Sequence, residues 1–498
     1  TFVVGNATNS TVIWNVTDPL NVTQVPTEKS ENGLEFTKKT EQLQEFVAVN
    51  PTGSGFVTAE YVGKVANQNL HTMKDADYVI ITYPAFASQA NVLALKHMQV
   101  DGVKAVVVTP EQIYNEFSSG TPDATAYRWF MKMIYDQDNS TSKYLLLFGD
   151  GSFDNKGLLG TKLSPSHNFI LTFQSYSSLD ETCSFTTDDY FGFLEDNEGG
   201  PGTYGKATVD IGVGRLPVTS AEQATGVVNK ILNYMDEFRF GTWKNRVVLL
   251  GDDNESSTSQ NKFYTLSDGI ARIIASNNPA MEIKKIYLDA YTREVGSNGA
   301  HYPEVESLLQ NEINKGIVYL NYIGHSSKVG WSGEHIFTQS QASTLYNENM
   351  GLWFTASCQF SQFDDLTSSG GEDLILNPNG GPVALYSSSR VVYDDKNDDL
   401  NRALVKVLFD RDDDGRPICV GDIYKKSKQH LPTDTNKLAF SLLADPMLRL
   451  SYPDLFVVTD SMSTLSGEPI DTMKALSKVR VFASIKDNEG NKITTFNG

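Results

Sequence analysis

Two residues suited to nucleophilic catalysis, Cys358 and His325, each follow a run of apolar residues. His325 follows the run VYLNYIG, and Cys358 ends the next run, LWFTASC. Such runs predict β-strands buried on both faces, as in parallel sheets. Because ligands bind beyond the carboxyl ends of strands in open α/β sheets, we expect both side chains at one edge of a sheet. An imidazole there can accept the thiol proton, and the resulting thiolate can attack a carbonyl carbon.

Each of these residues alone has a simpler interpretation. A cysteine after an apolar strand is most often a small buried hydrophobic residue, and a single histidine is most often a polar surface residue. Cys358 and His325 together, each at the end of an apolar strand, favour a catalytic pair. A cysteine nucleophile with a histidine partner is therefore the leading hypothesis.

The segments around this pair alternate between buried strands and helices. Alternating βα units predict an α/β fold, with one or two mostly parallel sheets flanked by helices. Residues 220–238 carry apolar side chains at helical spacing, which predicts a helix packed against the core. The apolar runs include DYVIITYP, VKAVVVT, YLLLFGD, RVVLLGD and GPVALYSS.

Three domains are expected along the chain. Residues 1–75, with short alternating runs rich in Thr, Val and Asn, predict a β-rich N-terminal segment. Residues 76–453 form the α/β domain, in two subdomains with a boundary near residue 240. In residues 454–498 the runs DLFVVTD and KVRVFASIKDNEGNKI predict the first strands of an Ig-like β-sandwich. The sequence stops shortly after this hairpin, so we expect it to be part of a longer protein.

The composition excludes several classes of function. The chain has 41 Lys and Arg residues against 61 Asp and Glu residues, a net charge of −20, so no nucleic-acid partner is expected. No apolar run reaches the ~18 residues of a membrane-spanning helix. The cysteines Cys183, Cys358 and Cys419 fit neither a disulfide framework nor a CxxC metal site.

The chain resembles the gingipain-type (C25) family of cysteine peptidases over about residues 76–453. Its clan, which also contains caspases and legumains, has an apolar block ending in His and a small residue, then an apolar block ending in Cys. TPEQIYNEFSSGTPDATAYRWFMKMIYD and TMKALSKVRVF are more similar to one subgroup, the C-terminal signal peptidases (sortases) of the type IX secretion system. The segments that match the family are YLLLFGDGS, DDYFGFLED, VDIGVGRLP, NYIGHSS, TASC and LLADPMLRLSYP.

The resemblance implies roles for further residues of the site. In gingipains a carboxylate in the strand before a Gly-Arg pair is placed to orient the histidine, and Asp210 of VDIGVGR has that position here. Gingipains have Glu there, and the alternative for the shorter Asp210 is a strand-edge residue with a backbone partner. The clan also implies an oxyanion hole formed by backbone N–H groups of Gly324 or Ser326 and of Cys358.

Residues that follow the strands at this edge are expected to line the substrate cleft. The segments VGWSGEH and SSSRVVYDD indicate Trp331, Ser388 and Arg390 as substrate-binding residues. Trp331 fits a packing role equally well. No equivalent of the acidic pocket that gingipains use for Arg and Lys side chains can be placed, so no preference for basic residues is carried over.

One acidic segment matches part of a metal-binding motif. Asp410, Asp412 and Asp414 lie in DRDDDG, which has the D-x-D-x-D-G opening of a calcium loop. The twelfth position of that loop is Gly421, where such loops use Glu. A solvated acidic turn is the favoured interpretation, and a structural calcium ion is the alternative. The expected catalytic chemistry requires no cofactor.

The resemblance implies a peptidase and transpeptidase at the bacterial cell surface, outer-membrane-associated or secreted. Its partners would be secreted cargo proteins with C-terminal sorting domains and other secretion-system components. Cys358 would hold the cargo as a thioester until an amine on anionic lipopolysaccharide displaces it. Acyl transfer and hydrolysis share every step up to the acyl-enzyme, so a secreted gingipain-like endopeptidase is an alternative. A catalytically idle surface-binding protein is another, and the intact Cys–His pair counts against it.

Overall fold

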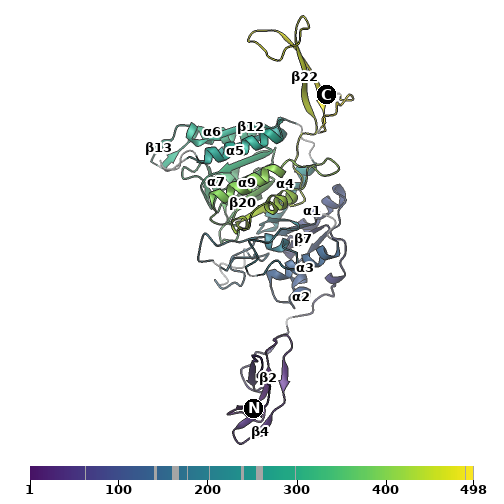
Figure 1. Cartoon of the computed structure of the whole chain (residues 1–498), viewed down its shortest axis with the longest axis vertical. Coiled ribbons are helices and arrows are strands. Elements are labelled where there is room, and N and C mark those ends of the chain that lie inside the picture. Colours follow the sequence, from purple (N-terminus) through teal and green to yellow (C-terminus); the bar gives the residue numbers. More distant parts are fainter. Residues whose placement is uncertain are drawn as a thin grey trace. The chain divides into compact units, whose positions relative to one another are not determined.

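The protein consists of two compact units, Thr1–Asn67 and Gln68–Gly498. The structure is a computed structural model (Figure 1). It describes residues 1–61, 63–138, 143–159, 168–176, 178–200, 202–236, 241–253, 262–297, 299–487 and 489–496. The division between the units falls before the boundary near residue 75 expected from the sequence.

The N-terminal unit is built from short antiparallel strands, in agreement with its alternating sequence. The strands are β1 Phe2–Val4, β2 Val12–Asn15, β3 Thr23–Val25, β4 Glu28–Ser30, β5 Gly33–Phe36 and β6 Phe46–Val49. They form two three-stranded sheets, with the orders β1–β5–β4 and β3–β2–β6. Ile13, Val25 and Phe36 form a small apolar core, against which Val4 and Phe46 pack.

The larger unit contains a ten-stranded sheet. Its strands are β7 Tyr78–Thr82, β8 Ala105–Val108, β9 Tyr144–Phe148, β10 Gly212–Leu216, β11 Arg246–Gly251, β12 Glu282–Tyr287, β15 Tyr319–Ile323, β19 Leu352–Ala356, β20 Ala384–Ser388 and β21 Phe440–Leu443. The strand order is β12–β11–β15–β19–β20–β21–β10–β9–β7–β8. All neighbours are parallel except β20 and β21. The sheet therefore has two parallel halves, which β21 joins.

Helices pack against this sheet in two rows. One row contains α5 Lys262–Asn277, α9 Asp394–Val407 and α10 Val420–Gln429. The other contains α1 Ala87–Val100, α4 Ala221–Asp236, α8 Gly370–Leu376 and α7 Gln339–Thr344. α4 falls within the predicted helix at residues 220–238 and buries Ala224, Val227, Val228 and Ile231. Three further α-helices of the described residues are α2 Pro110–Phe117, α3 Ala124–Gln137 and α6 Pro303–Lys315. The predicted α/β fold with a mostly parallel sheet is confirmed.

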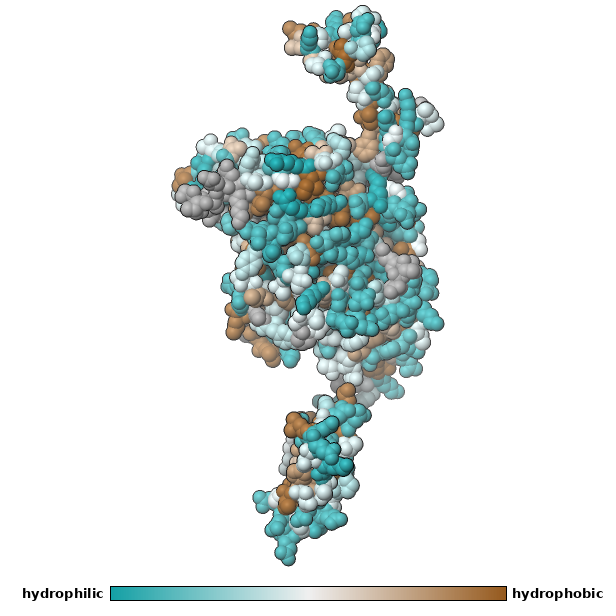
Figure 2. Space-filling view, in the orientation of Figure 1, coloured by the Kyte–Doolittle hydropathy of each residue, from teal (hydrophilic) through white to brown (hydrophobic). Residues whose placement is uncertain are grey.

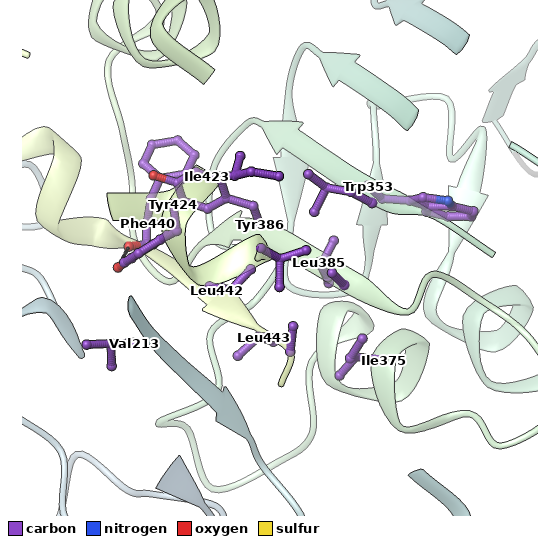
Figure 3. Packing of buried hydrophobic residues seen from close by; sticks show 14 of the residues in the cluster. Val213, Trp353, Ile375, Leu385, Tyr386, Ile423, Tyr424, Phe440, Leu442 and Leu443 are labelled. Carbon is purple, nitrogen blue, oxygen red and sulfur yellow. Dashed lines mark hydrogen bonds between the residues drawn. The ribbon is translucent and has the colours of Figure 1, made fainter. Parts of the chain in front are cut away.

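The continuous apolar runs become strands buried on both faces. Every residue of β7, β9, β10, β15, β19 and β20 is buried. Figure 3 shows the core where the two halves meet, with Leu385 and Tyr386 of β20 beside Phe440, Leu442 and Leu443 of β21. Dense packing at this junction fixes the spacing of the strands on either side.

Strands outside the ten-stranded sheet complete the larger unit. They are β13 Glu294–Gly296, β14 Gly299–His301, β16 Ser326–Ser327, β17 Gly330–Trp331, β18 Phe337–Thr338, β22 Phe456–Thr464 and β23 Val479–Lys486. β22 and β23 form an antiparallel hairpin, whose extension into an Ig-like sandwich stays a prediction. The face of the molecule seen in Figure 2 is largely hydrophilic. Within the described residues, no helix is long and apolar enough to cross a bilayer.

Candidate active site

The register of two neighbouring strands brings His325 and Cys358 to the same edge of the sheet. In the parallel pair β15–β19, Ile323 lies opposite Ala356. Each candidate residue follows its strand's last paired residue by two positions, so both leave the sheet at the same height. The two residues line one pocket of about 230 Å³. Its lining is Phe263, Ile323, Gly324, His325, Ala356, Cys358, Val392, Tyr393, Asp394 and Asn397.

The Cys358 thiol is half-buried in this pocket. Its Sγ–H donates a hydrogen bond to the backbone oxygen of Val392 at 3.6 Å. Burial raises the pKa of the Cys358 thiol above its ordinary value, and the contact with Val392 opposes this only in part. The thiol is therefore protonated at neutral pH, and attack on a substrate requires a base that accepts the proton.

The His325 imidazole is exposed to solvent at the mouth of the pocket. Its ring lies edge-on to Phe263, with the centroids 5.2 Å apart and an angle of 88° between the planes. An accessible imidazole that lines the same pocket as the thiol is suited to act as that base, and later as the acid for the leaving group.

The backbone of His325 is hydrogen-bonded to the buried carboxylate of Asp252. The His325 N–H donates to Oδ2 of Asp252 at 2.8 Å. The His325 carbonyl accepts from the Tyr322 hydroxyl at 2.6 Å and from the Ser332 N–H at 2.8 Å. A Cβ on Gly324 would lie 2.3 Å from Cβ of Asp252, so only glycine lets the chain approach this closely. The histidine loop is therefore anchored to the end of β11.

Asp252 and its neighbour Asp253 were not predicted from the sequence. They directly follow β11, in which Gly251 lies opposite Ile323 of β15. Burial raises the pKa of Asp252 to about 7, against hydrogen bonds from the His325 N–H and the Tyr322 hydroxyl that favour the charged form. The sequence could have indicated these two aspartates, because RVVLLGDD is an apolar run that ends in polar residues, as the His325 and Cys358 segments do.

Asp210 lies apart from the histidine loop. Its carboxylate accepts a hydrogen bond from the Leu194 N–H at 2.9 Å, and its own N–H donates to the Gly192 carbonyl at 2.9 Å. Burial, together with the nearby Glu198 and Glu195, raises the pKa of Asp210 to about 6. Asp210 is not part of the pocket lining. The geometry corresponds to the strand-edge alternative, a carboxylate with a backbone partner, and Asp252 occupies the position behind the histidine.

The residues expected to form the oxyanion hole differ in their relation to the pocket. Gly324 lines the pocket, whereas Ser326 lies beyond its lining. The Ser326 hydroxyl donates to the Cys358 carbonyl at 2.5 Å, which ties the two catalytic loops together. Stabilisation of an oxyanion by backbone N–H groups of Gly324, Ser326 and Cys358 stays a prediction.

Trp331 packs in the core and does not line the pocket. Its side chain is fully buried and stacks on Tyr322, with the ring centroids 4.7 Å apart. Trp353 and Phe360 pack around the same indole. The packing interpretation of Trp331 is therefore the one that the structure supports, because a substrate cannot reach the ring.

Ser388 and Arg390 brace the cysteine loop instead of lining the pocket. The buried Ser388 hydroxyl donates to the Ser357 carbonyl at 2.5 Å. The Arg390 guanidinium binds both carboxylate oxygens of Asp364, with 2.6 Å between Nη1 and Oδ1. The lining contributed by this part of the chain begins just beyond them, at Val392.

The acidic turn at residues 410–414 is paired with basic side chains. Arg449 binds Asp412 at 2.9 Å, and Arg416 binds Asp414 at 3.2 Å. Asp410 lies 3.5 Å from Lys426. These pairs neutralise the carboxylates, which favours the acidic-turn interpretation over a calcium loop.

Comparisons with known proteins bear on the family and the fold of the chain. The sequence matches the family model of peptidase family C25 over residues 71–451. The crystal structure of the Arg-specific cysteine proteinase gingipain R (RgpB) has 17% identity and a TM-score of 0.58, over 79% of this chain and 83% of that chain. Dimeric latent PorU from Porphyromonas gingivalis has 26% identity and a TM-score of 0.56, over 100% of this chain and 42% of that chain. The search of curated proteins gave no match.

The two structural relatives support different conclusions. At 17% identity, the gingipain R structure shows a shared fold. The PorU match extends over both units of this chain, although the chain spans less than half the length of that protein.

Proposed function

The chain belongs to peptidase family C25, and on this premise we propose that it is a cysteine peptidase and transpeptidase of the bacterial cell surface. Its substrates would be secreted cargo proteins that carry C-terminal sorting domains. It would cut off the sorting domain and transfer the cargo to an amine of anionic lipopolysaccharide, in association with other secretion-system components at the outer membrane.

One observation supports a sorting activity in addition to general peptidase activity. The family match covers residues 71–451, whereas the similarity to PorU covers 100% of this chain. The PorU match therefore includes the N-terminal β-strands and the C-terminal hairpin, which the family match leaves out. Because the similarity to PorU includes all of these parts, we expect this protein to have the same role in secretion.

The proposed reaction uses the two loops of the pocket. His325 accepts the proton from the Cys358 thiol, and the thiolate attacks the carbonyl carbon of the scissile peptide bond. Collapse of the tetrahedral intermediate breaks the C–N bond, and His325 gives its proton to the leaving amine of the sorting domain. The cargo remains as a thioester on Cys358. An amine then attacks this carbonyl, returns its proton through His325, and releases the thiol.

Hydrolysis is the second candidate function, because water can replace the amine in the last step. Family membership and the Cys358–His325 pocket support it equally well. The same pocket counts against a catalytically idle surface-binding protein.

Mass spectrometry of the products distinguishes these functions. The protein would be incubated with a cargo protein carrying its sorting domain, with and without an amine nucleophile. Transpeptidation yields cargo increased by the mass of the amine, whereas hydrolysis yields cargo with a free carboxylate in both samples. No cleavage by the wild type, under conditions in which the thiol reacts with an alkylating agent, would refute both functions. The Cys358→Ala variant, which lacks the proposed nucleophile, serves as the negative control.

A further inference from the structure

Three buried carboxylates lie together behind the histidine loop. They belong to Asp252 and Asp253 at the end of β11, and to Glu334 in the segment between β17 and β18. One oxygen atom from each residue lies within 4.8 Å of the others. The three residues are 2%, 8% and 3% exposed, respectively, so water screens their charges poorly.

The hydrogen bonds around this cluster leave one carboxylate oxygen unsatisfied. The Tyr302 hydroxyl donates to Oδ2 of Asp253 at 2.6 Å. The Oδ1 atom of Asp253 is also buried, and it has no hydrogen-bond partner among the described residues. A buried carboxylate oxygen without a partner is unfavourable, which indicates that a ligand supplies the missing interaction.

The charges of the cluster are only partly balanced. Arg293 binds Glu334 at 2.8 Å, and its own side chain is half-exposed. Within the described residues, no Lys, Arg or His forms an ion pair with Asp252 or Asp253. A bound cation would remove this imbalance.

We propose that Asp252, Asp253 and Glu334 form a binding site for a divalent cation, with calcium preferred. Carboxylate oxygens are ligands of hard cations such as Ca²⁺ and Mg²⁺. Calcium binds several carboxylates in an adaptable geometry, whereas magnesium keeps several waters and usually takes only one or two carboxylates. Three carboxylates whose oxygens all lie within 4.8 Å of one another therefore favour calcium.

Such an ion would act on the catalytic histidine through the backbone. Asp252 accepts the His325 N–H, and the Ser332 N–H donates to the His325 carbonyl. Ser332 precedes Glu334 by two residues, and its hydroxyl accepts the Glu334 N–H at 3.1 Å. A cation bound to Asp252 and Glu334 would therefore fasten both ends of the segment 325–334 to the end of β11. Occupancy should stabilise the position of His325 beside the thiol.

Calcium titration of the whole chain, after removal of metal with a chelator, tests the site. We expect the wild type to bind Ca²⁺ below about 1 mM, and to show a rise in thermal midpoint with calcium concentration. Glu334→Gln and Asp253→Asn should each bind at least tenfold more weakly, because each removes one charged ligand. Asp414→Asn, in the paired acidic turn, is the matched control and should bind like the wild type. No binding by the wild type, unchanged affinity in both site variants, or loss of binding in Asp414→Asn would overturn the proposal.

A second measurement is independent of whether the variants fold. Crystals of the wild type soaked in Tb³⁺, which replaces Ca²⁺, give an anomalous peak wherever the ion binds. A peak between the three carboxylates supports the site. The absence of a peak there, or a peak only at residues 410–414, contradicts it.

Discussion

Each half of the ten-stranded sheet contains two adjacent buried aspartates, and these two aspartate pairs differ in how their charge is neutralised. In the half that contains β10, both oxygens of Asp188 accept hydrogen bonds from the buried Arg215, at 2.7 and 2.8 Å. Asp189, next in sequence, forms a buried ion pair with Lys428 at 2.7 Å. In the half that contains β11, the oxygens of Asp252 accept from a backbone N–H and a tyrosine hydroxyl, and within the described residues no basic side chain pairs with them.

This difference separates structural from functional use of buried charge. A paired carboxylate keeps its charge in the interior and holds distant segments together, but it is unavailable to other ligands. Asp252 lies behind the catalytic histidine, and burial raises its pKa to about 7, so its charge responds to protons or cations near neutral pH. We expect substitutions at Asp188 to reduce stability, and substitutions at Asp252 to reduce activity.

Loss of the nucleophile should have the largest effect on turnover. Cys358→Ala should lower it by at least ~10⁴-fold, with little change in thermal midpoint, because the thiol is only half-buried. The exposed Cys183 provides the matched control, since Cys183→Ala should keep full activity. Iodoacetamide followed by mass spectrometry should modify Cys358 before the buried Cys419. Full activity of Cys358→Ala would end the cysteine-peptidase interpretation.

Loss of the base should be nearly as damaging. His325→Ala should lower turnover by ~10²–10⁴-fold, the usual contribution of a general acid–base group. Because the two residues act as one catalytic unit, the double variant with Cys358→Ala should be little worse than either single variant. Kinetics of all three variants on one cargo substrate measure this, and additive losses would show that the residues act independently.

Breaking the ion pair between Asp188 and Arg215 should act on folding. Asp188→Asn leaves the Arg215 guanidinium buried without a charged partner, which we expect to lower the free energy of unfolding by ~3–5 kcal/mol. Urea unfolding followed by circular dichroism measures the change. Turnover of the folded fraction should stay within a few-fold of the wild type. A loss below ~1 kcal/mol would remove the basis for the comparison between the two aspartate pairs.

The buried His97 should make stability depend on pH. Its ring binds Asp101 and Asp445, and although burial alone would lower the pKa, these carboxylates raise it to about 9. A raised folded-state pKa gives a stabilisation that is complete below the unfolded value of about 6.5 and is lost as pH rises through about 9. This amounts to on the order of 3 kcal/mol. Unfolding between pH 6 and pH 10 should show the loss, and His97→Gln should abolish it.

The smallest effect on stability is expected for Asp252→Asn. Asn removes an unneutralised charge and keeps one oxygen to accept the His325 N–H, so the free energy of unfolding at pH 7 should change by less than ~1 kcal/mol. Turnover should fall by about tenfold, because the histidine loop loses its charged anchor. Because the pKa of Asp252 is raised in the folded state, the free energy of unfolding should fall as pH rises from about 4 through 7. The variant should lack this dependence on pH.

Unfolding of wild type and Asp252→Asn, both measured in chelator to exclude bound metal, tests the last expectation. The comparison fails if Asp252→Asn loses as much stability as Asp188→Asn.

The sequence by itself determined the strands and the nucleophile–base pair. Runs that are apolar at every position are stable only when both faces are covered, so YLNYI and LWFTA had to become interior strands. Polar residues directly after such runs are released at the carboxyl ends, where His325 and Cys358 now line one pocket. These features follow from local patterning alone.

The tertiary structure decided which strands are neighbours, and with them the rest of the site. β11 lies beside β15, which puts Asp252 behind His325, whereas β10 lies beyond β20 and β21, which leaves Asp210 outside the pocket. Trp331 follows the histidine strand closely, yet it packs into the core because Tyr322 and Trp353 offer it an apolar site. Strand order and side-chain burial depend on packing between segments far apart in the chain, and no local pattern of residues encodes them.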